Sequence, residues 1–327
     1  MMTFAQIGVG YWGPNLLRNL VMNKKCRVKT VADLAKERRS FVQGLYPAID
    51  VTDQVRRVFE DPEIEAVVIA TPAQTHFELT LKALEAGKHV LVEKPMAMTV
   101  AEIDAIEKRA VERKRVAMSG HTFLYNAAVR YVKKLIDAGE LGQVRYIYSQ
   151  RLNLGRIRSD IDALWNFAPH DISIIQYWLG DPEPESIVRR GVDYIQAGID
   201  DVAFMNILYP GKIMANIHVS WLDPRRLRVM TVVGSRKMVI YDNDAENKIA
   251  VYDKGIDRRH ALGQDMDYDN PRFVGFEHRE GDVLLPKIDF TEPIKVEIEH
   301  FMDCIRNGTP CLSGLDHTRK VVRILSA

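Results

Sequence analysis

A glycine-rich turn near the start of the chain constrains its fold more than any other stretch. Gly8, Gly10 and Gly13 form a G-x-G-x-x-G motif between an apolar run at residues 4–7 and a helical pattern. In such a turn the first glycine permits the tight bend, the second lets the backbone approach a pyrophosphate, and the third lets helix and strand pack closely. The phosphates then lie at the helix N-terminus, where free N–H groups favour negative charge. The stretch predicts a dinucleotide-binding turn.

An acidic residue follows this turn at an informative distance. The predicted second strand, residues 27–32, ends in Asp33, twenty residues after the last glycine of the motif. A carboxylate there accepts hydrogen bonds from the adenosine ribose hydroxyls. It also repels a 2′-phosphate, and Leu34 offers no cation to bind one, so the sequence favours NAD over NADP. Arg38 and Arg39 weaken this preference, and a glycine turn without any ligand is the alternative.

Length and composition set broad limits. The 327 residues suit two domains better than one core. The 45 basic and 44 acidic residues nearly cancel, so no electrostatic footprint points to nucleic acid or to an anionic membrane. We find no run of eighteen apolar residues and no signal-peptide pattern, and expect a cytoplasmic protein. Cys26, Cys304 and Cys311 are spaced like neither a disulfide framework nor a zinc site, so we expect reduced, structural thiols and no metal.

Two further buried strands are predicted to end at the edge where cofactors bind. One ends at Thr71 and Pro72, and His76 in the next helix could touch the cofactor or be a surface or capping group. The other delivers Glu93 and Lys94. A lysine partly desolvated beside a nicotinamide has a lowered pKa and can transfer a proton or orient a substrate hydroxyl. A solvated salt bridge of Glu93 with Lys94 is the alternative.

These motifs together resemble the Gfo/Idh/MocA family of sugar and cyclitol oxidoreductases. The resemblance rests on residues 8–13, on Thr71-Pro72 with His76, and on Glu93-Lys94-Pro95. It implies that Lys94 is a catalytic-site residue and that the peptide bond before Pro95 is often cis. The cofactor-binding residues that we expect are Gly8, Gly10, Tyr11, Trp12, Gly13, Asp33, Thr71, Pro72, His76, Glu93 and Lys94.

The expected fold class is α/β. Residues 1–120 would form a Rossmann domain with a doubly wound parallel sheet, and a helix at 315–327 would pack back on it. Residues 121–314 would form an α+β domain for substrate binding and oligomerisation, whose open, mostly antiparallel sheet the resemblance implies. Turns at Pro210-Gly211 and Gly234-Ser235 indicate its hairpins. The expected strands span residues 143–153, 186–192, 202–209, 212–221, 228–233 and 237–241.

This sheet also suggests self-association. Met214, Ile217, Val219 and Trp221 compete for burial, whereas helices can cover only one face of the sheet. We therefore expect a homo-oligomer, a dimer or a tetramer, formed through the C-terminal sheet, as the resemblance also implies. Residues 257–282 are polar and would form a long excursion, either a lid or an oligomer contact.

A second group of candidate catalytic residues lies in the predicted helix around residues 164–172. Helical spacing places Asn166 and His170 on one face. The resemblance implies that the histidine is the general acid/base and that an acid precedes it by four residues, but here that position is Asn166. An amide can orient the imidazole without raising its basicity by charge. Asp171 points elsewhere on a regular helix, and a structural role for His170 is the alternative.

Several segments resemble the WlbA-type UDP-N-acetylglucosaminuronate 3-dehydrogenases within the family. They include residues 11–15, 153–156, 164–165 and 168–173. Guanidinium groups suit carboxylate or phosphate, so a nucleotide-sugar substrate would be bound by Lys94, Arg151, Asn153, Arg156, Asn166 and His170. Arg158 and a second cluster at Arg225, Arg226 and Arg228 could serve the same end. The alternative for both clusters is that they are solvated loop charges or interface ion pairs. The rival functions are a dehydrogenase of free sugar or inositol, a 3-ketoreductase of a nucleotide sugar, and a non-catalytic NAD-binding sensor.

Overall fold

The computed structural model describes residues 1–155, 157–259 and 275–327, which form two compact units. The first unit contains Met1–Ala127, Ile172–Tyr177 and Phe290–Ala327. The second contains Ala128–Asp171 and Trp178–Asp289. The functional domains that we expect at 1–120 and 121–314 stay a prediction, and the two units are described separately.

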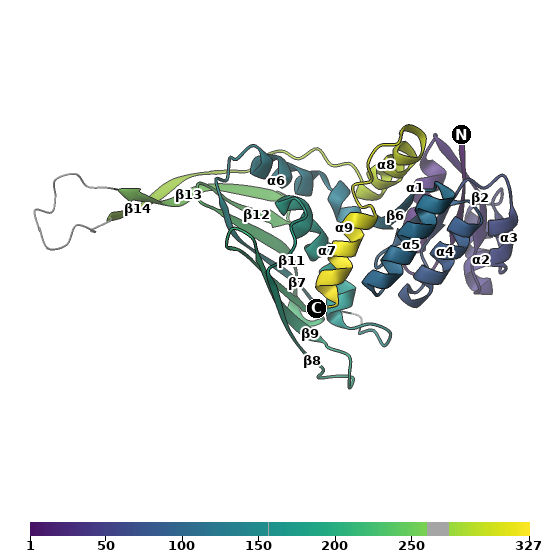
Figure 1. Cartoon of the computed structure of the whole chain (residues 1–327), viewed down its shortest axis with the longest axis horizontal. Helices are drawn as coiled ribbons and strands as arrows, with labels where there is room; N and C mark the ends of the chain where they lie inside the picture. The colour runs from purple at the N-terminus through teal and green to yellow at the C-terminus, as the bar shows by residue number, and fades with distance from the viewer. Residues whose placement is uncertain (156, 260–274) are drawn as a thin grey trace, which may run out of the picture. The chain divides into compact units, whose positions relative to one another are not determined.

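A six-stranded parallel sheet forms the centre of the first unit, in the order β3-β2-β1-β4-β5-β6 (Figure 1). Its strands are β1 Met2–Ile7, β2 Cys26–Ala32, β3 Asp50–Thr52, β4 Ala66–Ile69, β5 His89–Glu93 and β6 Ala117–Gly120. The intervening helices are α1 Gly13–Met22, α2 Lys36–Leu45, α3 Val55–Glu60, α4 His76–Glu85 and α5 Val100–Arg113. The order runs outward from β1 in both directions, so the topology switches between β1 and β4. The predicted doubly wound sheet is confirmed.

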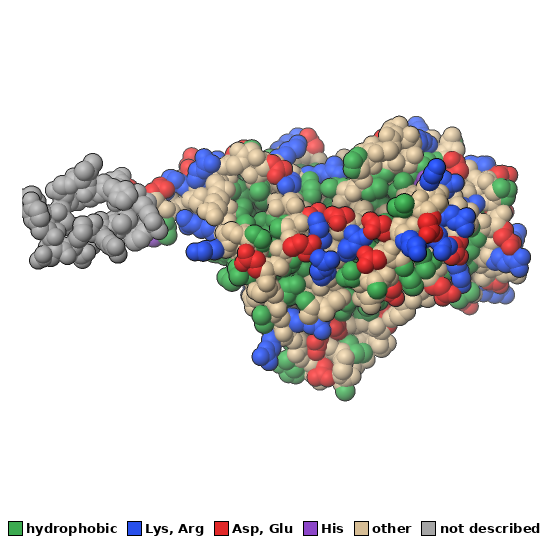
Figure 2. Space-filling view, in the orientation of Figure 1, with side chains coloured by type: hydrophobic (Ala, Val, Ile, Leu, Met, Phe, Trp, Pro, Cys, Tyr) green, Lys and Arg blue, Asp and Glu red, His purple; other side chains and the backbone are tan. Residues whose placement is uncertain are grey.

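The last two helices complete this unit. Helix α8, Pro293–Asn307, contributes Ile298 and Phe301 to the core that also contains Phe4 and Leu16. Helix α9, Leu315–Leu325, holds α5 through Arg319, which donates hydrogen bonds to Asp104 and Glu107. Figure 2 shows acidic and basic side chains interspersed over α4, α5 and α9. The surface there carries no field of a single sign.

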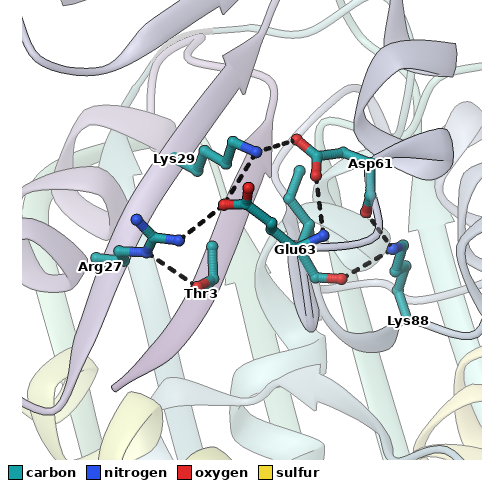
Figure 3. Close-up of polar contacts among 7 residues, drawn as sticks. Thr3, Arg27, Lys29, Asp61, Glu63 and Lys88 are labelled. Atoms are coloured by element: carbon teal, nitrogen blue, oxygen red, sulfur yellow. Dashed lines mark hydrogen bonds and ion pairs between the residues drawn. The ribbon is translucent and has the colours of Figure 1, made fainter.

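Charged side chains also connect the strands at the edge of the sheet where β1, β2, β4 and β5 begin (Figure 3). The ammonium group of Lys29 lies 2.7 Å from Asp61 and 3.2 Å from Glu63. Arg27 lies 3.0 Å from Glu63. Lys88 Nζ donates hydrogen bonds to the carbonyl oxygens of Asp61, at 2.6 Å, and Ile64, at 2.8 Å. These contacts hold the turn between α3 and β4 to the neighbouring strands.

Replacing Lys88 by methionine should destabilise the protein. Lys88 is buried, and the change would keep the length of its side chain but leave two carbonyl groups without their charged donor. Hydrogen bonds to charged groups contribute about 1.5–3 kcal/mol each, so the loss of both should lower the free energy of unfolding by about 3 kcal/mol or more. Urea unfolding would measure it, with Lys82→Met as the control because Lys82 makes only an (i, i+4) surface pair with Glu78. Equal stability of the two variants would contradict the assigned role.

An eight-stranded sheet forms the second unit, in the order β14-β13-β12-β11-β7-β10-β9-β8. Among the described strands of this sheet, β7 and β10 alone pair in parallel, so the predicted open, mostly antiparallel sheet is confirmed. Helix α6, Ala127–Asp137, is tied to helix α7, Ala163–Leu179, because Trp178 Nε1 donates to the Val129 carbonyl at 2.9 Å. The strands are β7 Val144–Leu154, β8 Ser186–Val192, β9 Val202–Tyr209, β10 Ile213–Ser220, β11 Leu222–Gly234, β12 Met238–Asp242, β13 Ile249–Arg259 and β14 Gly275–Leu284.

Strand β10 shows how the sheet divides its apolar side chains. Ile217, Val219 and Trp221 are completely buried, whereas Met214 is 51% exposed. Side chains alternate along a strand, so Met214 lies on the opposite face from Ile217 and Val219. The four residues that we expected to compete for burial therefore do not all lie on the same face of the sheet.

Two segments differ from the sequence expectation. Strand β11 begins at Leu222 rather than at residue 228, which places Arg225 and Arg226 within a strand. In the predicted excursion at 257–282, both ends belong to the antiparallel pair β13 and β14, and residues 260–274 lie outside the described part. Across the described ranges, no helix has the length and apolar composition needed to span a membrane.

Candidate active site

The glycine turn is built as the motif predicts. Gly8 has a φ of +91°, and a Cβ on it would lie 2.5 Å from the Ala70 carbonyl oxygen. A Cβ on Gly13 would lie 2.6 Å from the Gly8 carbonyl oxygen, whereas one on Gly10 would meet nothing within 4 Å. Gln6 Nε2 donates to the carbonyls of Gly8 and Gly13 at 2.9 and 2.8 Å. Gly8 and Gly13 thus serve the internal packing, and the open side of Gly10 fits the approach of a pyrophosphate.

The residues next to the turn leave the start of α1 accessible. Tyr11 is 86% exposed and Trp12 is 42% exposed. Trp12 is the N-cap residue of α1 and makes no side-chain capping bond, and proline occupies the first turn. The turn and the helix N-terminus therefore suit the phosphates of a dinucleotide.

Asp33 fixes the turn from the end of β2. Its Oδ2 accepts the Val9 N–H at 2.7 Å, and its Oδ1 accepts the Ala35 N–H at 2.9 Å. Each carboxylate oxygen has a second lone pair, so the half-buried group can still accept ribose hydroxyls. Arg39 Nη1 donates to the carbonyls of Asp33 and Leu34, both at 2.8 Å. Its guanidinium group is thus engaged by the backbone of this loop.

His76 connects the two loops that carry the other predicted residues. Its imidazole nitrogens lie 2.7 Å from the Pro95 carbonyl oxygen and 2.8 Å from the Thr71 carbonyl oxygen. The His76 side chain is buried, so the structure places it beneath the loops rather than on the surface, whereas Thr71 is half-buried and Pro72 is exposed. His76 therefore holds the loop after β4 to the loop after β5.

Glu93 and Lys94 lie at the carboxyl end of β5. The Lys94 N–H donates to Glu93 Oε2 at 3.2 Å, and the Lys94–Pro95 peptide bond is cis. Burial raises the pKa of the Glu93 carboxyl group to about 7, although the Lys94 charge and a hydrogen bond from Trp12 oppose this rise. Lys94 is half-buried. The pair is thus partly desolvated, as a proton-transfer role requires.

Helix α7 of the second unit carries Asn166 and His170, both half-buried. The helix starts after Asp162, whose Oδ1 accepts the Trp165 N–H at 2.7 Å. Asp171 turns away from this face and binds Arg151: Nε lies 2.9 Å from Oδ2, and Nη2 lies 3.0 Å from Oδ1. Both side chains of this bidentate pair are buried. The Arg151 that we expect at the substrate therefore also anchors the helix that carries His170.

The other predicted arginines are spread over the second unit. Arg158 pairs with Asp160, and Arg226 pairs with Asp244 at 2.9 Å. Arg228 lies opposite Arg151 in the register of β11 and β7. Asn153 is a half-buried residue of β7, and Arg156 lies outside the described residues. Acidic partners thus neutralise part of both clusters.

Sequence reasoning missed the polar groups behind Lys94. Glu297 is completely buried on α8, where residues 294, 297, 298 and 301 follow the spacing of an apolar helix face. An acidic residue within an apolar helix face predicts a buried carboxyl group, and the sequence alone shows this signal. His121, buried directly after β6, is another missed residue. No group of three or more metal-binding side chains occurs in the part of the chain that the structure describes.

Comparison with known proteins identifies the class. Residues 2–121 match the model "Oxidoreductase family, NAD-binding Rossmann fold", and residues 129–240 match "GFO/IDH/MocA C-terminal domain". The protein is therefore an oxidoreductase with an NAD-binding Rossmann domain. The chain belongs to the Gfo/Idh/MocA family.

Relatives cover the chain to different extents. The scyllo-inositol 2-dehydrogenase (NAD(+)) of Bacillus subtilis is 26% identical over 96% of this chain and 89% of its own length. The 2,7-anhydro-N-acetylneuraminate hydratase of Mediterraneibacter gnavus is 28% identical over 63% of this chain, and the match spans only 58% of the hydratase. The structure of UDP-N-acetylglucosamine 3-dehydrogenase GnnA from Acidithiobacillus ferrooxidans has a TM-score of 0.81 and 25% identity, and the match covers 99% of this chain and 95% of that one.

Proposed function

We propose that this protein oxidises a secondary hydroxyl group of a sugar with NAD, at C3 of a nucleotide sugar such as UDP-N-acetylglucosaminuronic acid. The observation that carries the proposal is the half-buried Lys94 beside Glu93, at the carboxyl end of a strand in an NAD-binding domain. The nucleotide-sugar substrate is supported by the resemblance of residues 153–156 and 168–173 to the WlbA-type enzymes. The structural similarity to a UDP-N-acetylglucosamine 3-dehydrogenase also supports it.

The proposed roles follow from the chemistry of each side chain. NAD, when bound, accepts the hydride from the carbinol carbon. Lys94 hydrogen-bonds the reacting oxygen and stabilises the charge that develops on it, and His170 takes the hydroxyl proton. Asn166 positions the imidazole, and side chains supply both the cation and the base, so the reaction requires no metal. The turn at Gly10 and the start of α1 would hold the pyrophosphate, and Asp33 would accept hydrogen bonds from the adenosine ribose.

Oxidation of a free sugar or of inositol is the second candidate. Its support is the scyllo-inositol dehydrogenase, whose similarity extends over nearly the whole chain. The pairing of Arg151 with Asp171 and of Arg226 with Asp244 also favours it, because these cations already have anionic partners. A third candidate is a sensor that binds NAD without turnover, because Asn166 stands where the family has an acidic residue.

The exposed face of the second unit supports the proposed dimer or tetramer. Met214 lies beside Tyr146 in the register of β10 and β7 and beside Leu208 in the register of β10 and β9. Large apolar or aromatic side chains on this face are more than one-third exposed: Tyr146, Tyr148, Phe204, Leu208 and Met214. A second copy of the sheet would cover them.

Absorbance of the reduced nicotinamide tests the substrate. The purified protein with NAD is mixed in parallel with UDP-N-acetylglucosaminuronic acid, with UDP-N-acetylglucosamine and with scyllo-inositol. A rise with the uronic acid alone, or with both nucleotide sugars, supports the first candidate, and a rise with the inositol alone replaces it by the second. If the protein binds NAD, but the absorbance does not rise with these substrates and does not fall when NADH is mixed with a 3-keto nucleotide sugar, the sensor remains.

A further inference from the structure

A second polar layer lies behind Lys94. Glu93 pairs with Gly120 in the register of β5 and β6, and a Cβ on Gly120 would lie 3.3 Å from Glu93 Oε1. Two residues further along, Thr122 Oγ1 donates a hydrogen bond to Glu297 Oε2 at 2.8 Å. The carboxyl groups of Glu93 and Glu297 therefore both lie near the carboxyl end of β6, close enough for the Glu93 charge to act on Glu297, although they are 204 positions apart (297 − 93) in the sequence.

Both carboxyl groups have an atom that lacks a partner. Oε1 of Glu93 and Oε1 of Glu297 are buried and accept no hydrogen bond from the residues that the structure describes. Glu297 is completely buried between Ile294, Ile298 and Phe301 of the same helix. A buried carboxylate oxygen without a donor is costly, which favours a protonated form for one of the two acids.

Among the groups around Glu93 and Glu297, the ammonium group of Lys94 carries a positive charge. Lys94 follows Glu93 directly, and its charge lowers the pKa of His121, which burial already lowers well below the usual range. The His121 ring lies edge-on to the His317 ring, with centroids 5.5 Å apart, and His317 Nε2 is 2.8 Å from Ser173 Oγ. Tyr125 faces Glu297 from the short helix after β6, and burial and that acid raise its phenol pKa. Two carboxylates against one ammonium would leave a net buried negative charge.

The environment distinguishes the two acids. Burial raises the pKa of the Glu297 carboxyl group well above its usual range, the Glu93 charge raises it further, and the Thr122 hydroxyl only partly opposes this. Glu93 has Lys94 and the Trp12 indole N–H to stabilise its charge. The proton therefore stays on Glu297, and the charge belongs on Glu93 once the pH exceeds the Glu93 pKa of about 7.

We propose that Glu297 is a positioning residue: it stays neutral behind the Glu93–Lys94 pair, so that Glu93 is the single carboxylate beside the Lys94 ammonium. The residue acts through Glu93 and need not touch substrate or cofactor. Its role in turnover rests on the proposed role of Lys94, whereas its protonation can be measured without any reaction.

The pH dependence of unfolding tests the protonation. In the unfolded chain Glu297 loses its proton near pH 4.5, whereas in the folded chain it keeps it. Above pH 4.5 the folded state thus binds one more proton, and stability falls as the pH rises, by about tenfold in the folding equilibrium constant per pH unit for this group. Glu297→Gln removes this contribution. We would measure urea unfolding between about pH 5 and 7. The folding equilibrium constant of this variant, divided by that of the wild type, should rise by up to about tenfold per pH unit.

Glu299→Gln is the matched control. Glu299 lies on the same helix, 3.6 Å from Lys25 at the surface, and the stability of this variant should follow that of the wild type across this pH range. If the relative stability of Glu297→Gln does not change with pH, Glu297 is ionised in the folded protein. That result would overturn the proposal, whatever the enzyme does.

The pH profile of kcat/KM tests the positioning role. Glu297→Met keeps the length of the side chain but replaces the carboxyl dipole near Glu93 by an apolar group, so the surroundings of the Glu93 carboxylate become less polar and its pKa rises. We expect the acid limb of the profile to move up by about one unit in Glu297→Met, with unchanged NAD affinity, and the amide in Glu297→Gln to restore most of it. A purely structural role would lower stability and leave the limb in place, which would overturn the positioning role. Activity in Lys94→Ala would instead remove the proposed function while the unfolding result stands.

Discussion

Replacing Lys94 by alanine should lower kcat/KM by about 10²–10⁴-fold and leave NAD affinity nearly unchanged. In the proposed mechanism the ammonium group of Lys94 is the cation next to the reacting oxygen, and its loss removes a stabilisation that is largest in the transition state. The turn at Gly8–Gly13 and Asp33 are built independently of this side chain, through contacts with Gln6 and Val9. Steady-state kinetics and quenching of protein fluorescence by NAD would separate the two effects.

Two further variants sharpen this test. Lys82→Ala removes a lysine from the same unit that makes only a surface pair, and it should keep full activity. Lys94→Arg keeps the charge, but a guanidinium group cannot give up its proton, so a proton-transfer role for Lys94 predicts no rescue, whereas a purely electrostatic role predicts a partial one. Full activity of Lys94→Ala would sink the proposed function.

Replacing His170 by glutamine should cost about 10²–10⁴-fold in kcat/KM and remove an ionisation from the pH profile. The imidazole is the only proposed base, and a glutamine amide can hydrogen-bond but cannot take a proton. The buried pair of Arg151 and Asp171 holds this part of α7 in place, so the variant should fold normally, as circular dichroism would show. His278→Gln, on the exposed strand β14, is the control for loss of a histidine.

Asn166→Asp extends the same experiment. A carboxylate four residues before His170 should raise the pKa of the imidazolium form and shift the ionisation in the profile to higher pH. A His170→Gln variant with an unchanged profile would assign the proton transfer to another group. An unchanged profile in Asn166→Asp would show that the two side chains do not interact.

Local rules in the sequence were sufficient to predict the first sheet and the edge at which we propose that the cofactor binds. Gly8 and Gly13 are required because a Cβ at either position would clash with backbone atoms. The spacing of the glycines in the motif predicts this requirement. Lys94 could be placed because it directly follows a continuous apolar strand. The alternation of side chains along β10 was also visible in the sequence. Grouping four apolar residues together, without noting which were odd-numbered and which even-numbered, missed that they lie on two different faces.

Long-range pairing could not be derived in the same way. Arg151 binds Asp171 across twenty positions, and no pattern within either segment indicates the other. Strand β11 extends to Leu222, which pairs with Leu154 of β7 beyond a register shift, and no pattern in the sequence indicates this pairing. Glu297 differs again: its position in an apolar stripe was visible, but its partner Thr122 becomes a neighbour only in the folded chain.

The composition of the first unit has a consequence for how the protein is made. Its core needs Ile298 and Phe301 from α8, and its helix α5 is held by Arg319 from α9. When the ribosome has synthesised β6, every strand of this sheet has been made, but α8 and α9, which complete the unit, have not. The second unit is synthesised in between, so the NAD-binding half, although its strands are made first, is the last to become a finished structure. A premature stop shortly before α8 would remove the cofactor site's support rather than an accessory tail.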